Sequence, residues 1–377
     1  MNCHPWFRAG LALIFLLVPG CAAPFVETSV LANDGDFTTN EYVLPTQRCG
    51  DYFVVAALID GRGPYPMLLD TGAGTTVLSP SAAREIGVSS RMESVQIDRF
   101  QANGSIPCVI REVDHLSRAL GLKIQGILSY GVFEGVLLTY DYPQQEIRVQ
   151  AGAFTANELS HPDVVPTSAG DRPFVRASVG GNDFTVLLDT GSSRGLTLTA
   201  LDRFAFEGPL VDTGARMRIN GLFLVRSGRL LHDMRLGPLN LHRAVVNHSV
   251  SINLAGQRIL RNFVITFDQV NHRVRFANPF GQVGDPISFA SLYGSGLVTV
   301  PGNDSLVVRK IFADSAGHRA GILLDDEILA INGTAISERG CRHLEFRPHG
   351  KAETVEYLSR RKGKQITIGM VPDVMVP

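Results

Sequence analysis

The 377-residue chain is predicted to be mainly β, with two similar lobes in tandem followed by a smaller C-terminal domain. Residues 65–72 recur at 184–191, so that the segment Leu-Leu-Asp-Thr-Gly occurs twice. Residues 129–149 then align without a gap on residues 256–276. Both copies consist of short β-branched and aromatic runs separated by Gly, Pro and Asn-Gly, which is typical of strands joined by turns. The repeat therefore predicts two β lobes of common origin.

The spacing of the repeats sets the domain boundaries. The two copies are offset by 119 residues at the first match (189 minus 70) and by 127 at the second (256 minus 129). The second copy thus carries eight more residues between its two matches. We expect a first lobe at 41–150, a linker at 151–168, a second lobe at 169–280 and the C-terminal domain at 288–374.

Composition excludes one class of function. The chain has 35 Lys and Arg residues against 36 Asp and Glu, a formal net charge of -1. It contains no run of five like charges, so it lacks the basic footprint of a nucleic-acid-binding protein. A hydrophobic content of 45% over this length predicts a large core. We expect no nucleic-acid partner.

The N-terminus has the anatomy of a signal peptide over residues 1–21. Arg8 precedes an apolar run at 9–18, which is too short to cross a bilayer as a helix. Residues 18–21 (Val-Pro-Gly-Cys) resemble a bacterial lipobox, which makes Cys21 a candidate for lipidation and membrane attachment; plain cleavage or a simple anchor is the alternative. Residues 22–40 are polar and aperiodic and are interpreted as a tether. We expect an exported chain, periplasmic or anchored facing the periplasm.

The remaining cysteines are Cys49, Cys108 and Cys341. An exported protein permits disulfides, and Cys49 and Cys108 fall in one predicted lobe, so a bond between them is open. The chain contains neither Cys-x-x-Cys nor His-Glu-x-x-His, and its histidines are scattered. We expect no metal site and no cofactor.

Two Asp-Thr-Gly turns that face each other have a specific chemistry. Two carboxylates about 3 Å apart cannot both ionise, so they share one proton. One carboxylate can then deprotonate a water held between them while the other, protonated, donates to a substrate carbonyl oxygen. Glycine allows the backbone to turn close beside the pair.

Residues 68–78 (LLDTGAGTTVL) and 187–192 (LLDTGS) resemble the retropepsin and pepsin-like aspartic proteases, most closely the bacterial members with two retropepsin-like lobes in one chain. The resemblance covers about residues 45–280. It implies an aspartic endopeptidase acting on peptide or protein substrates, with a bilobal, pepsin-type β fold. By position, Asp70 and Asp189 form the dyad. The same resemblance assigns its support to the residues that follow each aspartate, which are Thr71, Gly72, Thr190 and Gly191.

The family also has a hydrophobic-hydrophobic-Gly element and a hairpin flap in its lobes. Residues 254–256 (Leu-Ala-Gly) match the first of these in the second lobe, whereas residues 127–129 (Ile-Leu-Ser) have Ser129 in place of glycine. Asn-Gly between apolar runs is a hairpin signal. It occurs in each lobe, so the candidate flap tips are Asn103 with Gly104 and Asn220 with Gly221; both could also be ordinary surface turns.

Two further motifs are interpreted as decoys. A third Asp-Thr-Gly at 212–214 lacks the apolar strand before it and is expected to be a turn. Residues 191–195 spell Gly-x-Ser-x-Gly, but a serine-hydrolase elbow must open a helix, and the alternating residues 196–199 predict a strand. The remaining alternative to an enzyme is a lobe pair that binds peptides without cutting them.

Residues 288–374 resemble a PDZ domain, on the runs 306–311, 314–321 and 326–333. The resemblance implies that C-terminal peptides add as a strand beside residues 297–300, with the terminal carboxylate held by the loop Gly294, Ser295, Gly296 and Leu297. A packing role against the protease lobes is the alternative. If the loop is a carboxylate site, Gly296→Val is expected to abolish binding without unfolding the domain.

Overall fold

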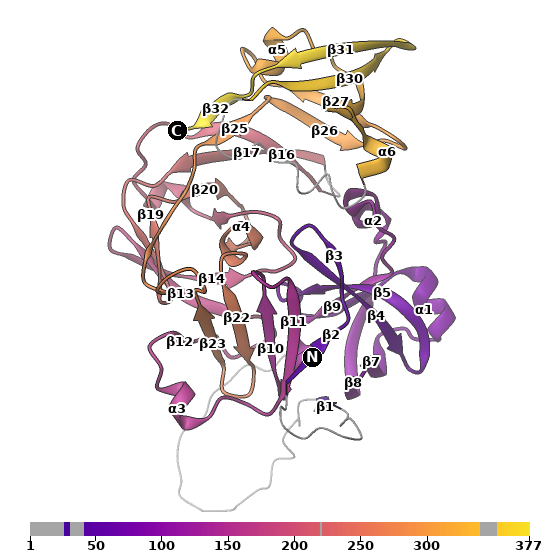
Figure 1. The fold of residues 1–377 in the computed structure, drawn as a ribbon, viewed down its shortest axis with the longest axis vertical. Helices are drawn as coiled ribbons and strands as arrows, with labels where there is room; N and C mark the ends of the chain where they lie inside the picture. The colour runs from indigo at the N-terminus through magenta and orange to yellow at the C-terminus, as the bar shows by residue number, and fades with distance from the viewer. Residues whose placement is uncertain (1–25, 31–40, 219–220, 340–352) are drawn as a thin grey trace, which may run out of the picture.

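The computed structural model describes residues 26–30, 41–218, 221–339 and 353–377, which are mainly β as predicted (Figure 1). In these residues the first lobe is built on an eight-stranded sheet of order β1-β8-β6-β9-β5-β4-β3, in which β7 pairs with β4 and β8. Its strands are β1 (Val26–Val30), β3 (Gln47–Cys49), β4 (Tyr52–Ile59), β5 (Arg62–Asp70), β6 (Thr76–Leu78), β7 (Arg91–Ile97), β8 (Phe100–Ile110) and β9 (Gly126–Ser129). Its helices are α1 (Pro80–Ile86), α2 (Asp114–Leu120) and the 3-10 helix η1 (Tyr130–Phe133).

The second lobe has a ten-stranded sheet of order β16-β17-β20-β15-β21-β14-β13-β18-β19-β24. Its strands are β13 (Phe174–Val179), β14 (Asn182–Leu188), β15 (Leu196–Leu198), β16 (Val211–Arg218), β17 (Gly221–Arg229), β18 (Met234–Leu236), β19 (Leu239–His242), β20 (Val245–His248), β21 (Leu254–Ala255) and β24 (Pro286–Ser288). Two short helices complete it, η2 (Leu201–Arg203) and α4 (Gln257–Leu260).

The two lobes repeat one pairing pattern around their Asp-Thr-Gly turns. In the first, β9 lies between β5 (parallel) and β6 (antiparallel), and β6 continues in parallel with β8. In the second, β21 lies between β14 (parallel) and β15 (antiparallel), and β15 continues in parallel with β20. The repeated sequence thus folds in the same way twice, which confirms the predicted fold class.

A six-stranded sheet joins the lobes, in the order β12-β23-β22-β10-β11-β2. It consists of β2 (Glu41–Leu44), β10 (Val136–Asp141), β11 (Glu146–Ala151), β12 (Val164–Pro166), β22 (Val264–Asp268) and β23 (Arg273–Ala277). The repeat partners Thr139 and Thr266 lie opposite each other in its central pair, with their hydroxyl oxygens 3.0 Å apart. One hydrophobic core extends through both lobes and this sheet.

The lobes differ in one insertion each. Between β15 and β18 the second lobe has 35 residues (199–233), which include the hairpin β16–β17, whereas the first lobe has 12 (79–90) between β6 and β7. Those 12 contain α1, which begins after the N-cap Ser79 and ends at the left-handed Gly87. Conversely, the first lobe has 15 residues (111–125) with α2 between β8 and β9, where the second has five (249–253). The eight extra residues of the second copy are therefore the net result of a longer segment in one place and shorter segments elsewhere.

In the N-terminal half one expectation requires correction, and one question that the sequence left open is answered. Residues 26–30, which were assigned to the tether, form β1 and pair with the edge of β8, because a strand edge offers unpaired backbone groups that an extended segment can satisfy. Cys108 is free and buried while Cys49 is disulfide-bonded, so these two cysteines do not pair. The predicted signal peptide, Cys21 and Cys341 lie outside the described residues. Residues 151–168, which were predicted as a linker, contain α3 (Ala156–Leu159) and β12.

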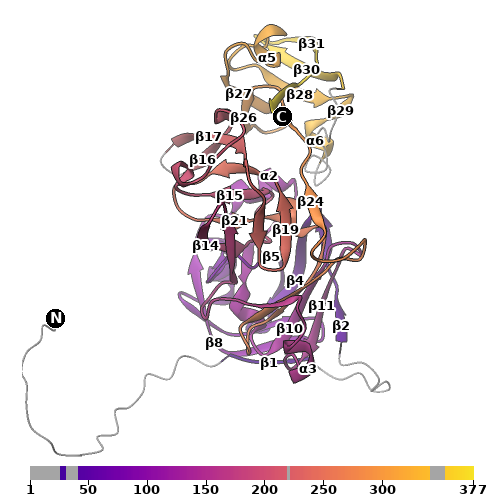
Figure 2. The same cartoon turned by 90° about the vertical axis from the view of Figure 1, so that its left-hand side faces the viewer.

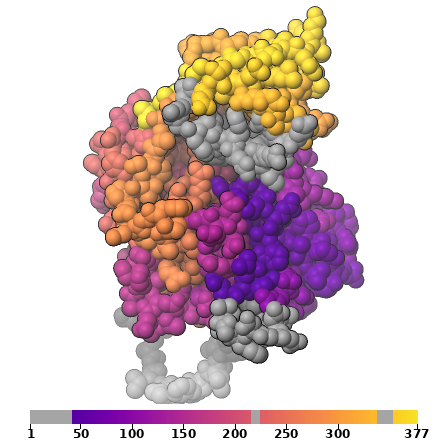
Figure 3. Space-filling view, viewed as in Figure 1, coloured from indigo at the N-terminus to yellow at the C-terminus, as the bar shows by residue number. Residues whose placement is uncertain are grey.

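The C-terminal part has a sheet and a core of its own (Figure 2). The sheet order is β26-β27-β28-β30-β31, with β29 against β28, and a separate pair is formed by β25 and β32. The elements are β25 (Leu292–Gly294), β26 (Leu297–Pro301), β27 (Leu306–Ile311), α5 (Ala316–Arg319), β28 (Glu327–Ile331), β29 (Thr334–Ala335), α6 (Ile336–Arg339), β30 (Val355–Arg361), β31 (Lys364–Met370) and β32 (Asp373–Val376). Figure 3 shows this domain, in orange to yellow, stacked on one end of the two lobes. Among the described residues no helix is long and apolar enough to span a membrane.

Candidate active site

The two aspartates come together where the repeated pairings place them. Asp70 is the last residue of β5 and lies opposite Ser129 of β9, while Asp189 follows β14 and its N–H donates to Ala255 O at 2.9 Å. The side chains of Asp70 and Asp189 are hydrogen-bonded to each other, and both residues are partly exposed. Turns 119 residues apart in the sequence therefore form one carboxyl pair.

Each glycine of the two turns lies against the aspartate of the other lobe. A Cβ placed on Gly72 would lie 2.6 Å from Cγ of Asp189, and one on Gly191 would lie 2.2 Å from Cγ of Asp70. Real Cβ atoms do not approach this closely, so glycine is required at both positions by the facing carboxyl rather than by a turn conformation. The N–H of Gly72 also donates to Asp70 Oδ1 at 2.7 Å.

The threonines link the two turns behind the carboxyl pair. The N–H of Thr71 donates to Thr190 Oγ1 at 3.0 Å, and the N–H of Thr190 donates to Thr71 Oγ1 at 3.1 Å. Thr71 Oγ1 in turn donates to Leu188 O at 2.7 Å. Both threonines are buried, so breaking this exchange would leave buried donors without partners.

The side chains that hold the two threonines in place differ between the two lobes. Thr190 Oγ1 lies 3.3 Å from the hydroxyl of Tyr140, a buried residue of β10, whereas the aligned position in the other copy is Phe267, which has no hydroxyl. The side-chain amide of Gln257 donates to Thr190 O at 2.7 Å. Sequence reasoning missed Tyr140 and Gln257. The Tyr–Phe difference within the aligned repeat was the available signal for Tyr140.

Although both residues are partly exposed, desolvation of their carboxyl groups is the first cause of the raised pKa of each. It raises the pKa of Asp189 to about 8, helped by the charge of Asp70 and by the hydrogen bond between the two side chains. Burial also raises the pKa of Asp70, but the backbone N–H groups of Gly72 and Gly191 and the hydrogen bond from Asp189 oppose this. These effects favour the shared proton on Asp189 and the negative charge on Asp70.

Ser192 contributes through its backbone. Its N–H stabilises the charged form of Asp189, whereas its hydroxyl accepts the N–H of Arg194 at 3.4 Å. The matching residue of the first copy is Ala73, which has no hydroxyl, so the sequence alone suggests an asymmetry of the dyad at Ser192. The structure places the hydroxyl asymmetry at Tyr140 instead.

The exchange of Gly for Ser in the first lobe has a local explanation. A Cβ on Gly256 would lie 2.5 Å from Ser192 O and 2.6 Å from Arg194 O, so the second lobe requires glycine there. In the first lobe Ser129 fits, because its hydroxyl lies 3.1 Å from that of Thr76 and its N–H donates to the same oxygen at 3.2 Å. The departure from the family pattern is therefore accommodated without disturbing Asp70.

The decoy motifs lie in different settings from the dyad. Asp212 and Gly214 belong to β16, where the register shifts between them, so the expectation of a turn was wrong, although Asp212 does not share the setting of Asp70 or Asp189. The Gly-x-Ser-x-Gly run is followed by the strand β15, as predicted, and not by the helix that a serine-hydrolase elbow requires.

One of the two predicted flap tips is wrong. Asn103 and Gly104 lie inside β8, and the turn of the β7–β8 hairpin is Asp98–Arg99, where the positive φ of Asp98 (50°) forms the reversal. Asn103 and Gly104 do not form the turn because β8 continues through them, paired with β1 on one side and β7 on the other. In the second lobe Gly221 begins β17 and pairs with Arg218 at the closed end of the long β16–β17 hairpin; Asn220 lies outside the described residues.

The predicted carboxylate loop connects β25 to β26. Gly294 ends β25 and Leu297 begins β26, while Ser295 O and Gly296 O accept from Gly317 N (2.8 Å) and Phe312 N (2.9 Å). Gly296 has a φ of +72°, and a Cβ there would lie 2.0 Å from Cβ of Ser315. The expectation that Gly296→Val would leave the domain folded is therefore wrong, because the valine would be strained and would overlap the start of α5.

No group of three or more metal-ligating side chains occurs in the part of the chain that the structure describes. The comparisons with known proteins bear on two regions. Residues 55–122 match the family model described as gag-polyprotein putative aspartyl protease, and this segment contains the first Asp-Thr-Gly. No match was found among curated proteins. A solved PDZ domain of a carboxy-terminal protease from Vibrio cholerae, in complex with peptide, is similar at 19% identity and a TM-score of 0.20, covering 22% of this chain and 95% of that one. At this TM-score the likeness does not establish a shared fold.

Proposed function

We propose that this chain is an exported aspartic endopeptidase in which Asp70 and Asp189 activate the water that hydrolyses a peptide bond. The observation that carries the proposal is the meeting of the two Asp-Thr-Gly turns, each glycine lying against the opposite carboxyl. The family match over residues 55–122 supports a protease of this class.

The roles of the two carboxyls follow from their surroundings. Asp70 accepts more backbone N–H groups and the proton of Asp189, so it is the general base that takes a proton from water. Asp189 holds the shared proton and is the general acid toward the substrate carbonyl oxygen. Attack by water then gives a tetrahedral intermediate without a covalent acyl-enzyme. Thr71, Thr190, Gly72 and Gly191 hold the two carboxyls in this geometry.

Further parts of the proposal concern access and location. The hairpin β16–β17 is the flap, since its place between β15 and β18 has no hairpin counterpart in the first lobe. The C-terminal domain recruits polypeptide C-termini through the loop at residues 294–297, and the chain acts in the periplasm, attached to the membrane if Cys21 is lipidated. Labelling with a radioactive fatty acid, compared between the wild type and Cys21→Ser, tests the attachment.

Cleavage of a mixed peptide library between pH 3 and 8 tests the activity. We expect Asp70→Asn and Asp189→Asn each to abolish cleavage, because each removes one partner of the proton-sharing pair. Asp212→Asn carries the same chemical change in the decoy motif and should retain activity. Peptide binding without cleavage by the wild type would instead support a non-catalytic peptide-binding protein, and loss of activity only in Asp212→Asn would contradict the assignment of the dyad.

A further inference from the structure

The helix α2 is an addition to the first lobe that the second lobe lacks. Its inward side chains Leu116 and Leu120 pack with a small satellite core that includes Val54, Leu68 and Ile124. The residues on its other side, Arg118 and Ala119, are exposed to solvent. Together with Gly121 they form one wall of a cavity of about 490 Å³ whose other walls belong to the C-terminal domain. The insertion thus meets that domain across an open space.

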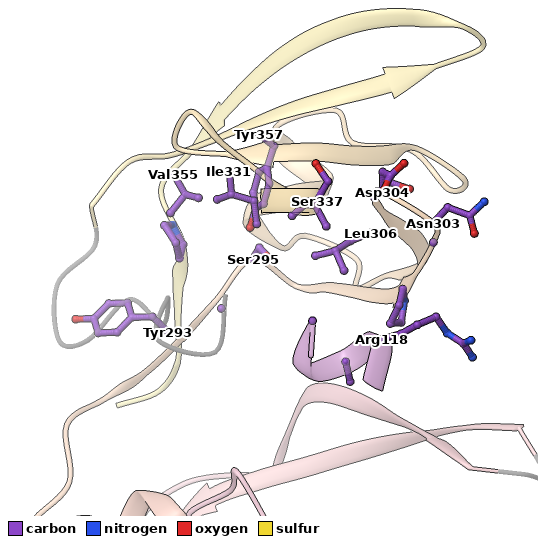
Figure 4. A pocket seen from close by; sticks show the side chains of 18 residues that line it. Arg118, Tyr293, Ser295, Asn303, Asp304, Leu306, Ile331, Ser337, Val355 and Tyr357 are labelled. Carbon is purple, nitrogen blue, oxygen red and sulfur yellow. The ribbon is translucent and has the colours of Figure 1, made fainter. Parts of the chain in front are cut away.

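The opposite walls have the properties of a strand-binding groove. β26 is an edge strand of the C-terminal sheet, paired with β27 on one side only within the described residues. Edge strands present unpaired backbone groups to which an extended peptide can add. Apolar side chains converge on the space from several elements, as Figure 4 shows, and those that line it include Leu306, Ile331, Ile336, Val355 and Tyr357. Its volume is in the usual range for ligand pockets.

Arg118, a residue of the first lobe, adds a positive charge to the lining of this groove. In Figure 4 it lies at the end marked by Asn303 and Asp304, with Tyr293 at the other end. No carboxylate among the described residues forms an ion pair with Arg118. Arg118 therefore places a cation at the edge of the groove, and Asp304 is the exposed acid among the lining residues that the structure describes.

We propose that the groove receives the C-terminal tail of another polypeptide and that Arg118 selects tails with an acidic residue upstream of the end. This rests on the recruiting role proposed above. A peptide that runs antiparallel to β26 with its carboxylate at residues 294–297 has its upstream residues near Pro301, at the Arg118 end. Since β26 runs from 297 to 301, the residue opposite Pro301 lies about four positions before the one opposite Leu297.

This chain's own C-terminus is not the occupant. Its last strand, β32, pairs with β25, and Pro377 O accepts a hydrogen bond from Arg229 of the second lobe. Since residues 373–377 are held elsewhere, we take a protein presented for cleavage as the occupant, which suits an endopeptidase.

Fluorescence anisotropy with the full chain carrying Asp189→Asn, which prevents cleavage, tests the proposal. The probes are labelled octapeptides with Glu, Gln or Lys four positions before the end, each as free acid and as amide. We expect the Glu peptide to bind three to five times more tightly than the Gln peptide, the range of an exposed ion pair, and the Lys peptide to bind most weakly. Arg118→Glu should reverse this order, whereas Lys123→Glu, an equal charge change on an exposed residue of the same insertion outside the groove, should preserve it.

The outcomes separate this inference from the proposal on which it rests. An unchanged order in Arg118→Glu, or an equal reversal in Lys123→Glu, overturns the role of Arg118. If the free acids still bind more tightly than the amides in that case, the recruiting role stands without it. If no peptide binds in a way that depends on its free carboxylate, the recruiting role is wrong and this inference falls with it. A Lys preference in the wild type would assign the charge selection to Asp304.

Discussion

At the scale of single residues, the chemistry of the site depends on a pair whose members are identical in sequence but not in surroundings. Asp70 and Asp189 follow the same Leu-Leu and precede the same Thr-Gly. The second turn alone, however, has Tyr140 and Gln257 against its threonine. In the proposed mechanism the two carboxyls divide the roles of acid and base for a different reason: desolvation and the charge of Asp70 favour the proton on Asp189, while backbone N–H groups favour the charged form of Asp70.

The raised pKa of Asp189 has a consequence for stability. A carboxyl whose pKa is about 8 when folded and about 3.8 when unfolded holds its proton more tightly in the folded state. The folded state therefore loses stability as pH rises from about 4 to about 8. Asp189→Asn cannot ionise, so its free energy of unfolding should exceed that of the wild type by up to a few kcal/mol at pH 8, with the difference shrinking toward pH 4.

Urea titrations of both proteins between pH 4 and 8 measure this difference. Asp212→Asn is the control, since its carboxyl lies outside the dyad, and its stability should follow the wild type at every pH. A constant difference between Asp189→Asn and the wild type across the range would mean that Asp189 does not carry the shared proton.

At the scale of elements, the hairpin β16–β17 is what distinguishes the second lobe. Polar side chains connect its base to the sheet. The hydroxyls of Thr213 and Ser227 lie 2.5 Å apart, Ser227 donates to Asn247 Oδ1 at 2.8 Å, and the amide of Asn247 donates to Leu196 O at 3.2 Å. Ser227 is fully buried, so this relay ties the hairpin to β20 and β15 without help from solvent.

Removing the middle of the relay should loosen the hairpin. Ser227→Ala leaves Asn247 Oδ1 and the Thr213 hydroxyl without this partner, and we expect a loss of about 1–3 kcal/mol in the free energy of unfolding. Hydrogen exchange of residues 211–229 should become faster, and KM for peptides should rise more than kcat falls if this hairpin covers bound substrate. Ser251→Ala, which changes an exposed serine in the loop between β20 and β21, is the control. Unchanged exchange in Ser227→Ala would show that the relay does not hold the hairpin.

At the scale of the whole molecule, the C-terminal domain is tied to the second lobe at two places. β24 extends the ten-stranded sheet in parallel with β19, just before the domain begins. Arg229, at the end of β17, donates to the carbonyls of Phe289 (3.1 Å), Arg243 (2.9 Å) and Pro377. The guanidinium of Arg229 thus links the second lobe, the segment that leads to the C-terminal domain, and Pro377. Burial of this side chain lowers the pKa of Arg229.

Truncating the Arg229 side chain should loosen the segment that joins the second lobe to the C-terminal domain. We expect Arg229→Ala to lower the free energy of unfolding by about 1–3 kcal/mol, because four carbonyls, including that of Ala290 (3.5 Å), lose a charged donor. Limited proteolysis should then cut within residues 286–296 faster than in the wild type. Arg226→Ala is the matched control, since Arg226 lies on the same strand with its side chain exposed. Equal cleavage rates in the two variants would mean that Arg229 does not hold the domain.

The sequence by itself determined the fold class, the repeat and the residues that meet at its centre. It could do so because the two copies have the same local pattern, an apolar strand followed by Asp-Thr-Gly, and therefore fold in the same way. Two lobes that fold alike pack about a common axis, which brings their turns together. The gap-free alignment of the two copies also matches Thr139 with Thr266, which lie opposite each other in the structure. The glycines, threonines and aspartates were therefore named correctly as neighbours, while their catalytic role remains a prediction.

Only the tertiary structure decided what depends on contacts between distant segments. Asn103 and Gly104 carry a hairpin signal, but pairing with β1 and β7 outweighs it, because strand partners on both sides satisfy more backbone groups than a turn would. That Cys108 is free, that Gly296 faces Ser315 and that Tyr140 reaches Thr190 are likewise matters of packing between segments that no local pattern describes. The same holds for α2, because only the arrangement of the domains places Arg118 beside a groove of the C-terminal domain.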